Sequence, residues 1–147
     1  MALSDATRLR ILFATPELAP WVKTGGLGDV SAALPAALAE AGLEVRVLVP
    51  GYPALLAAFA QRLTLVQLER PGGQLLPAAI SQVALRPGLE LLLLECPACY
   101  ERHGGPYQDR TGRDWADNAL RFGLLSKVAA LLASRDTPLD WRPHVLH

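Results

Sequence analysis

The segment KTGGLGDV at residues 23–30 combines a lysine with three glycines, a combination that could bind a phosphate group. Glycines allow backbone N–H groups to approach an anion, and Lys23 adds a full positive charge. The segment matches neither the G-x-G-x-x-G pattern of dinucleotide-binding folds nor the G-x-x-x-x-G-K-[ST] loop of NTPases. The residues alone therefore leave a second interpretation open, a glycine turn that only permits close packing of a strand against a helix.

The elements around this segment predict a β-α-β unit. Residues 10–15 and 44–50 are short apolar runs that predict buried strands, and residues 27–41 between them predict a helix. Such a unit pairs its strands in parallel through a right-handed crossover. Ligands of open α/β sheets bind beyond the carboxyl ends of the strands, which is where the glycine segment lies.

The predicted helix over residues 27–41 has one apolar face and one irregularity. Its face contains Val30, Leu34, Ala37, Leu38 and Ala41. Pro35 lies within it and lacks the N–H that would bond back to Ser31, at a cost of ~3 kcal/mol in a helix interior. We expect a kink or a fresh start of the helix at Pro35.

The chain beyond residue 50 continues to mix helices and strands. Helices are predicted over 54–61 and 114–133, strands over 63–68, 80–85 and 89–95, and turns at 71–73 and 87–88. Residues 96–113 are expected to form a long ordered loop, and residues 145–147 resemble the opening of another strand. The predicted fold class is therefore α/β, Rossmann-like, with a mostly parallel sheet.

Composition excludes several classes of protein. The 14 Lys and Arg residues balance the 14 Asp and Glu residues, whereas a nucleic-acid-binding domain usually carries a basic excess. No uncharged stretch reaches the ~20 residues that span a bilayer, and the apolar run after Arg10 is too short for a signal peptide. Since 51% of the residues are hydrophobic, the chain must bury a core. We expect a cytoplasmic protein with no nucleic-acid or membrane partner.

The two cysteines, Cys96 and Cys99, form a C-x-x-C sequence after a predicted strand, as in thioredoxin-like redox pairs. The segment 103–106 follows too soon for an amphipathic helix to begin at Cys99. Two small buried or loop cysteines are therefore the favoured interpretation. A structural zinc site would need a second pair of ligands, which the spacing does not offer. We expect no metal site and no cofactor.

Three separated blocks resemble the bacterial glycogen synthase and plant starch synthase family. The first runs from Pro16-Glu17 through KTGGLGDV to ALPAAL at 33–38. The second comprises YERHGGPYQD at 100–109 and DNALRF at 117–122. The third, WRPHVLH at 141–147, is similar to the approach to the family's H-x-H-D-W motif, with His147 matching its first histidine.

The resemblance implies transfer of glucose from ADP-glucose to the non-reducing end of an α-1,4-glucan, with retained configuration. It also implies a two-domain GT-B fold, in which residues 1–147 are the incomplete N-terminal part of the catalytic domain and the second nucleotide-binding domain is absent. The isolated chain is therefore expected to be inactive, with an exposed sheet edge and marginal solubility. The alternative is a generic nucleotide- or dinucleotide-binding oxidoreductase module, which predicts an acidic residue at the end of the second strand. That strand instead ends Val49-Pro50-Gly51-Tyr52.

The resemblance also implies roles for individual residues. Lys23 matches the lysine that contacts the diphosphate of the sugar nucleotide, and Gly25 and Gly26 match the glycines that bring backbone donors near it. Asp29 and Tyr107 match cleft residues that contact the sugar or the acceptor glucan. For Asp29 the alternative is a cap or charge complement of its helix, and for Tyr107 it is a residue that pins its loop.

The DNALRF block has a structural interpretation as well. Asn118 and Arg121 lie one helical step apart, so both side chains project from the same side of the predicted helix. We expect them to brace the preceding loop against this helix.

Overall fold

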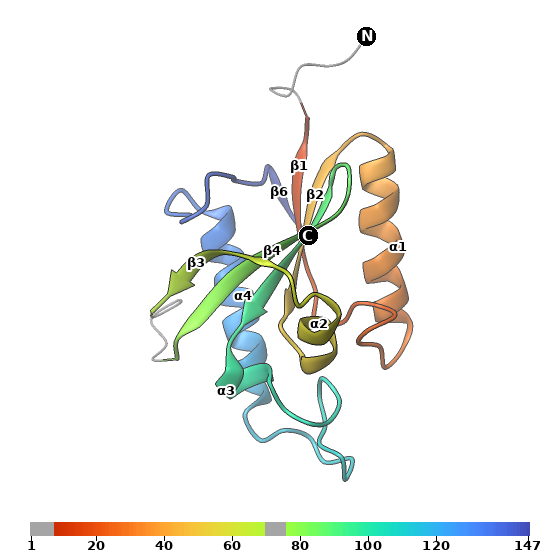
Figure 1. Ribbon diagram of the computed structural model, residues 1–147, viewed down its shortest axis with the longest axis vertical. Helices are drawn as coiled ribbons and strands as arrows, with labels where there is room; N and C mark the ends of the chain where they lie inside the picture. The colour runs from red at the N-terminus through yellow and green to blue at the C-terminus, as the bar shows by residue number, and fades with distance from the viewer. Residues whose placement is uncertain (1–7, 70–75) are drawn as a thin grey trace.

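The computed structural model describes residues 8–69 and 76–147, which build one six-stranded sheet in the order β3-β4-β5-β2-β1-β6 (Figure 1). The strands are β1 (Arg10–Ala14), β2 (Glu44–Pro50), β3 (Leu63–Leu68), β4 (Ala78–Arg86), β5 (Leu89–Glu95) and β6 (Val145–Leu146). Strands β5, β2, β1 and β6 pair in parallel, whereas β4 runs antiparallel to both β3 and β5. The predicted Rossmann-like α/β class is confirmed.

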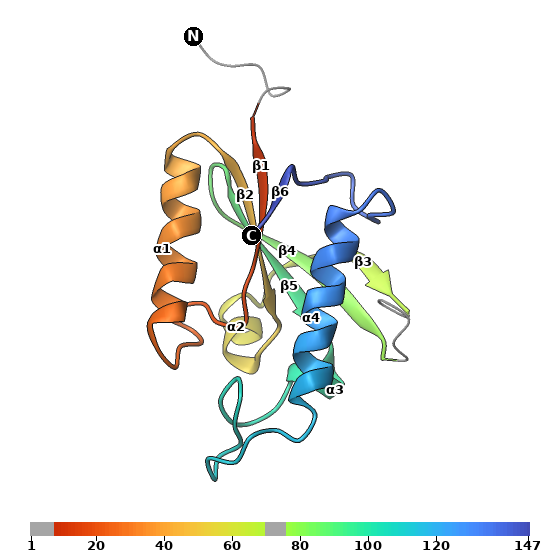
Figure 2. The ribbon, with the colours of Figure 1, turned by 180° about the vertical axis from the view of Figure 1, so that it is seen from behind.

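Two long helices cover opposite faces of the central strands (Figures 1 and 2). The helices are α1 (Gly26–Glu40), α2 (Pro53–Ala58), α3 (Pro97–Tyr100) and α4 (Asn118–Ala133). From β1 to β2 the chain moves along the sheet in one direction, and from β5 to β6 it moves in the other. Because both crossovers between parallel strands are right-handed, α1 and α4 must lie on opposite faces.

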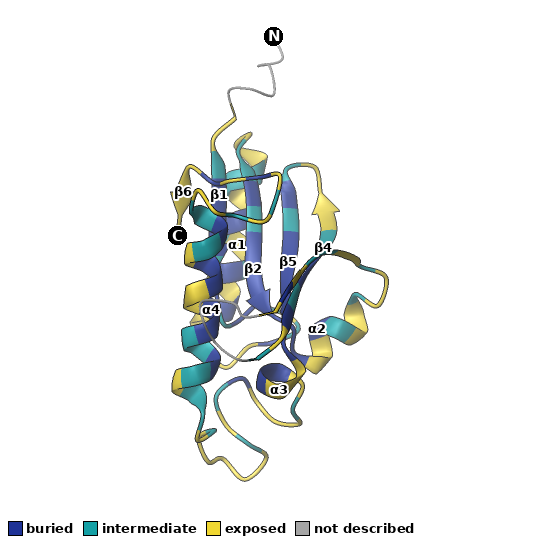
Figure 3. Ribbon diagram, turned by 90° about the vertical axis from the view of Figure 1, so that its left-hand side faces the viewer, coloured by how far each residue is buried: buried dark blue, intermediate teal, exposed yellow. Residues whose placement is uncertain are grey.

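The core is centred on β2 and β5, which are buried along most of their length (Figure 3). The four leucines at residues 91–94 have no exposed surface. Strands covered on both faces have no polar face, so they appear in the sequence as continuous apolar runs. None of the helices formed by the described residues has the length and apolar character needed to cross a bilayer.

Helix α1 begins and ends close to its predicted limits, but only Leu34 and Leu38 of its predicted apolar face pack against the core. Val30 is 52% exposed, and the buried residues are instead Gly28, Ser31 and Pro35. A Cβ at Gly28 would lie 3.2 Å from the Cβ of Lys23, so glycine permits a close approach between the helix and the preceding loop. The helix also continues through Pro35, so the expected fresh start is wrong. Pro35 removes only one backbone hydrogen bond, and its ring is buried in the core.

The segment after β5 differs most from its prediction. The expected loop over 96–113 contains the short helix α3, in which the N–H groups of Cys99 and Tyr100 both donate to the carbonyl of Cys96 at 2.9 Å. The helix predicted from residue 114 begins only at Asn118. The N–H of Trp115 donates to the carbonyl of Tyr107 at 3.0 Å, which keeps the residues before Asn118 in the loop.

Smaller differences concern the ends of elements. Helix α2 ends at Ala58 rather than at residue 61, and β4 extends beyond the predicted 80–85 at both ends. The predicted turn at 71–73 lies outside the described residues. The strand expected near residue 145 is present as β6, and Val145 and Leu146 are 42% and 45% exposed on this edge of the sheet.

Candidate functional site

The carboxyl ends of β1, β2 and β5 bring three connecting segments to one end of the sheet, the lower end in Figure 1. These segments are residues 15–25 before α1, the start of α2, and the loop over 101–117, named here the tyrosine loop. A cleft of about 310 Å³ lies between them. Open α/β sheets bind their ligands at this end because successive loops diverge there.

The glycine segment forms the first turn of α1 and the residues before it. Gly25 is the N-terminal cap residue and has no side chain to cap the helix. Open space surrounds Gly25 and Gly26, since a Cβ at either position would meet no atom within 4 Å. N–H groups in the first turn of a helix have no partner within the helix, so an anion can accept their hydrogen bonds.

Lys23 lies beside this helix end and forms an ion pair with Asp29. Its Nζ is 2.6 Å from Oδ2 and 2.8 Å from Oδ1 of the aspartate. The side chains are 45% and 58% exposed, so the pair is held weakly and an incoming anion can compete for the ammonium group. The carboxylate of Asp29 is engaged by Lys23, and its negative charge in the first turn of α1 is favourable for the helix.

Glu17 joins the glycine segment to the tyrosine loop, a role that no sequence pattern identified. Its carboxylate accepts hydrogen bonds from the Tyr107 hydroxyl at 2.7 Å, from Thr24 Oγ1 at 2.8 Å and from the Thr24 N–H at 3.2 Å. Burial is the largest influence on the pKa of Glu17 and raises it, but these hydrogen bonds together lower the pKa below its usual value. The one signal in the sequence that could have identified this role is the position of Glu17 between Pro16 and Pro20, in a segment that is otherwise apolar.

The tyrosine loop is braced by the first turn of α4, as predicted. Asn118 Nδ2 donates to the carbonyl of Tyr107 at 2.9 Å, and Arg121 Nη1 donates to the carbonyl of Pro106 at 2.8 Å. Arg121 Nη1 also donates to Asn118 Oδ1 at 2.7 Å, which holds the two braces together. Tyr107 pins its own loop, because its hydroxyl donates a hydrogen bond to Glu17. The centre of the Tyr107 ring lies 5.5 Å from the centre of the Phe122 ring.

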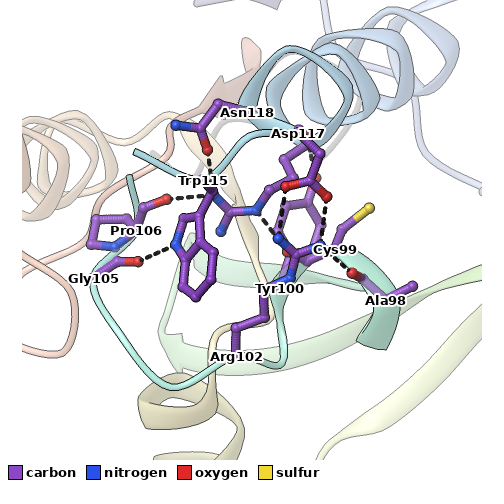
Figure 4. A network of polar contacts seen from close by, with 10 residues as sticks. Ala98, Cys99, Tyr100, Arg102, Gly105, Pro106, Trp115, Asp117 and Asn118 are labelled. Atoms are coloured by element: carbon purple, nitrogen blue, oxygen red, sulfur yellow. Dashed lines mark hydrogen bonds and ion pairs between the residues drawn. The ribbon is translucent and has the colours of Figure 1, made fainter. Parts of the chain in front are cut away.

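A second set of contacts closes the base of this loop (Figure 4). Arg102 forms a two-pronged ion pair with Asp117, with nitrogen–oxygen distances of 2.7 and 2.5 Å. The guanidinium of Arg102 lies 5.2 Å from the centre of the Trp115 ring, whose indole N–H donates to the carbonyl of Gly105. The loop ends are thereby fixed on both sides of Tyr107.

The two cysteines are not placed to act as nucleophiles in this site. Cys96 and Cys99 are buried, with 1% and 0% exposure, and neither is in a disulfide. Burial, with a smaller contribution from Cys96, raises the pKa of Cys99 to about 12. The described residues also contain no group of three His, Cys, Asp or Glu side chains that could hold a metal ion.

The mostly parallel Rossmann-like sheet, with the open N-terminus of α1 at its carboxyl edge, defines the class of this protein, because it matches part of a GT-B glycosyltransferase catalytic domain. Residues 10–147 match the family described as starch synthase catalytic domain, and the chain belongs to that family. The oxidoreductase alternative finds no support.

Individual relatives agree with this assignment. The chain is 60% identical over 141 residues to a glycogen synthase of Dechloromonas aromatica and 56% identical over 147 residues to one of Aromatoleum aromaticum. These alignments cover 95% and 99% of the chain but only 28% and 29% of the relatives. A solved structure of the catalytic domain of starch synthase IV from Arabidopsis thaliana, bound to ADP and acarbose, matches 96% of the chain and 28% of its own length, with 26% identity and a TM-score of 0.63.

Proposed function

We propose that this chain provides the N-terminal part of the catalytic cleft of a glycogen (starch) synthase. Such an enzyme transfers glucose from ADP-glucose to the non-reducing end of an α-1,4-glucan with retained configuration. The observation that carries the proposal is the uncapped, open N-terminus of α1 with Lys23 beside it, in a chain of the starch synthase family. The ADP in the Arabidopsis relative supports a nucleotide ligand.

In this proposal the donor diphosphate displaces Asp29 from Lys23. The first-turn N–H groups beyond Gly25 and Gly26 donate to the phosphate oxygens, and the Lys23 ammonium donates a charge-assisted hydrogen bond. Negative charge grows on the ADP oxygen as the bond to glucose breaks. Donors that are already in place stabilise that charge more than they stabilise the ground state, so they lower the barrier without a proton transfer.

The acceptor side is assigned to the tyrosine loop. An open space of about 530 Å³ lies between Thr24 and the loop, lined by Tyr107 and Asp109 among others. Because Glu17 holds the Tyr107 hydroxyl, we assign the ring face of Tyr107 to contact with a sugar. Asp29, once released from Lys23, would accept hydrogen bonds from sugar hydroxyl groups.

Further groups are needed for turnover, because the chain spans only about 28% of the length of its curated relatives. We propose that a second nucleotide-binding domain grips the donor and the acceptor from the opposite side, and that the reaction takes place in the cytoplasm. The 147-residue chain by itself is then expected to bind ADP weakly and to incorporate no glucose into glycogen.

Calorimetric titration tests the proposal directly. The chain is titrated with ADP and, separately, with NADH, and binding of ADP alone is the expected result. Binding of NADH without ADP would overturn the proposal in favour of an oxidoreductase module. Incorporation of labelled glucose into glycogen by the purified chain would overturn the need for a second domain.

A further inference from the structure

Lys23 lies on one wall of the cleft at the carboxyl end of the sheet, but the floor of this cleft is formed by residues that the donor proposal does not use. One wall is residues 21–23, another is the start of α2, and the third is residues 102–106 of the tyrosine loop. Aromatic side chains of Trp21, Tyr52 and Tyr100 line it together with Arg121. Its volume of about 310 Å³ lies at the lower end of the ~300–1,000 Å³ range of small-molecule sites.

Arg121 brings a buried positive charge to this floor. Its side chain is only 1% exposed, and Nε donates to the carbonyl of Cys99 at 2.7 Å. Nη1 donates to the carbonyl of Pro106 and to Asn118 Oδ1. The remaining nitrogen, Nη2, forms no hydrogen bond with residues 8–69 or 76–147, and it is not among the fully buried atoms that lack a partner, so part of its surface is accessible.

No carboxylate in the described part of the chain forms an ion pair with Arg121, and Asp117 attracts its charge only from a greater distance. The other two cations of the cleft are neutralised, Lys23 by Asp29 and Arg102 by Asp117, whereas no carboxylate lies within 4.0 Å of Arg121. The rings of Phe122 and Tyr100, at 5.3 and 5.8 Å from the guanidinium carbon, compensate the charge only partly. Burial is the main cause that lowers the pKa of Arg121. A buried charge without a partner is costly, so an anion in the cleft would be stabilised.

We propose that this cleft binds a phosphate group, either free or carried by a small sugar, with Arg121 Nη2 as its main donor. The planar guanidinium suits a phosphate oxygen, and the aromatic walls suit the apolar faces of a sugar ring. The cleft shares Lys23 with the proposed donor site, but Arg121 belongs to α4 and has no part in the donor assignment, so the proposal does not rest on that assignment.

Variants at the rim test the site without removing the brace that Arg121 provides. Ala54 is exposed on α2 and lines the cleft, whereas Ala57 is exposed on the same helix outside it. Ala54→Glu places a carboxylate opposite Arg121, and Ala57→Glu is the control with the same charge. The probes are inorganic phosphate, glucose 6-phosphate and uncharged glucose, measured by calorimetry on the 147-residue chain, with the circular dichroism spectrum as the check of folding.

The expected result is binding of both phosphate compounds but not of glucose, with the Kd raised at least about tenfold by Ala54→Glu and unchanged by Ala57→Glu. Tighter binding of glucose 6-phosphate than of phosphate would identify a sugar phosphate as the ligand, and equal binding would identify the free anion. Absence of binding, or equal weakening by both variants, would overturn the proposal. Equal loss of ADP binding in Ala54→Glu would also overturn it, because the cleft would then belong to the donor site.

Discussion

The hydroxyl of Tyr107 donates a 2.7 Å hydrogen bond to Oε1 of Glu17, which joins two loops 90 residues apart in the chain. Glu17 is 3% exposed and also accepts two hydrogen bonds from Thr24, so one buried carboxylate holds the tyrosine loop against the glycine segment. The spacing between the proposed donor and acceptor sides of the cleft therefore depends on Glu17.

Replacing this carboxylate should destabilise the chain in a pH-dependent way. Glu17→Gln removes a charged acceptor from buried donors, so we expect the free energy of unfolding at pH 7 to fall by about 1–3 kcal/mol. Because the pKa of Glu17 is lowered in the folded chain, its contribution is complete above the unfolded pKa of about 4.3 and is lost as the pH falls through the lower, folded pKa. Urea unfolding of both proteins from pH 7 to pH 3 measures this. A difference that does not shrink in acid would contradict the assignment.

Lys23→Ala should weaken nucleotide binding without affecting folding. Loss of a charge-assisted phosphate contact is expected to cost about 1.5–3 kcal/mol of ADP binding, measured by calorimetry. The unfolding midpoint should hardly change, because the Lys23–Asp29 pair is exposed. The control is Lys127→Ala, which replaces the other lysine of the chain. Equal ADP affinity in the two variants would remove Lys23 from the site.

Gly104→Ala should disrupt the tyrosine loop, whereas Gly105→Ala should be tolerated. A Cβ at Gly104 would lie 2.8 Å from the carbonyl oxygen of Gln108, and this residue has a φ of +154°. At Gly105 the nearest atom would be 3.6 Å away, an ordinary contact. We expect a loss of about 1–3 kcal/mol of unfolding free energy for the first variant and little change for the second, by urea denaturation. Equal losses would show that the loop does not require this close approach.

The cysteines should be unreactive in the folded chain. Burial of Cys99 and its pKa of about 12 leave little thiolate at neutral pH, and the thiolate is the reactive form. Iodoacetamide at pH 7.5 should alkylate the native chain far more slowly than the urea-unfolded chain, as followed by mass spectrometry. Rapid modification of the native chain would instead revive the redox interpretation of the C-x-x-C sequence.

The sequence determined the strands and the general position of the proposed site, because these depend on local patterns. Apolar runs such as residues 91–94 are buried on both faces of a mostly parallel sheet. A lysine with glycines between a strand and a helix predicts an anion site. The spacing of Asn118 and Arg121 was likewise sufficient to predict a brace.

The tertiary structure alone decided which groups meet. Helical periodicity placed Val30 on one apolar face with Leu34 and Leu38, but only the two leucines pack against the core. The fully buried residues of α1 are Gly28, Ser31 and Pro35, because small residues let the helix approach its neighbours closely. The Tyr107–Glu17 bond and the unpartnered nitrogen of Arg121 depend on where distant loops lie. Local patterns carry no information on contacts across 90 residues, since only the packing of the sheet and its helices brings such loops to one edge.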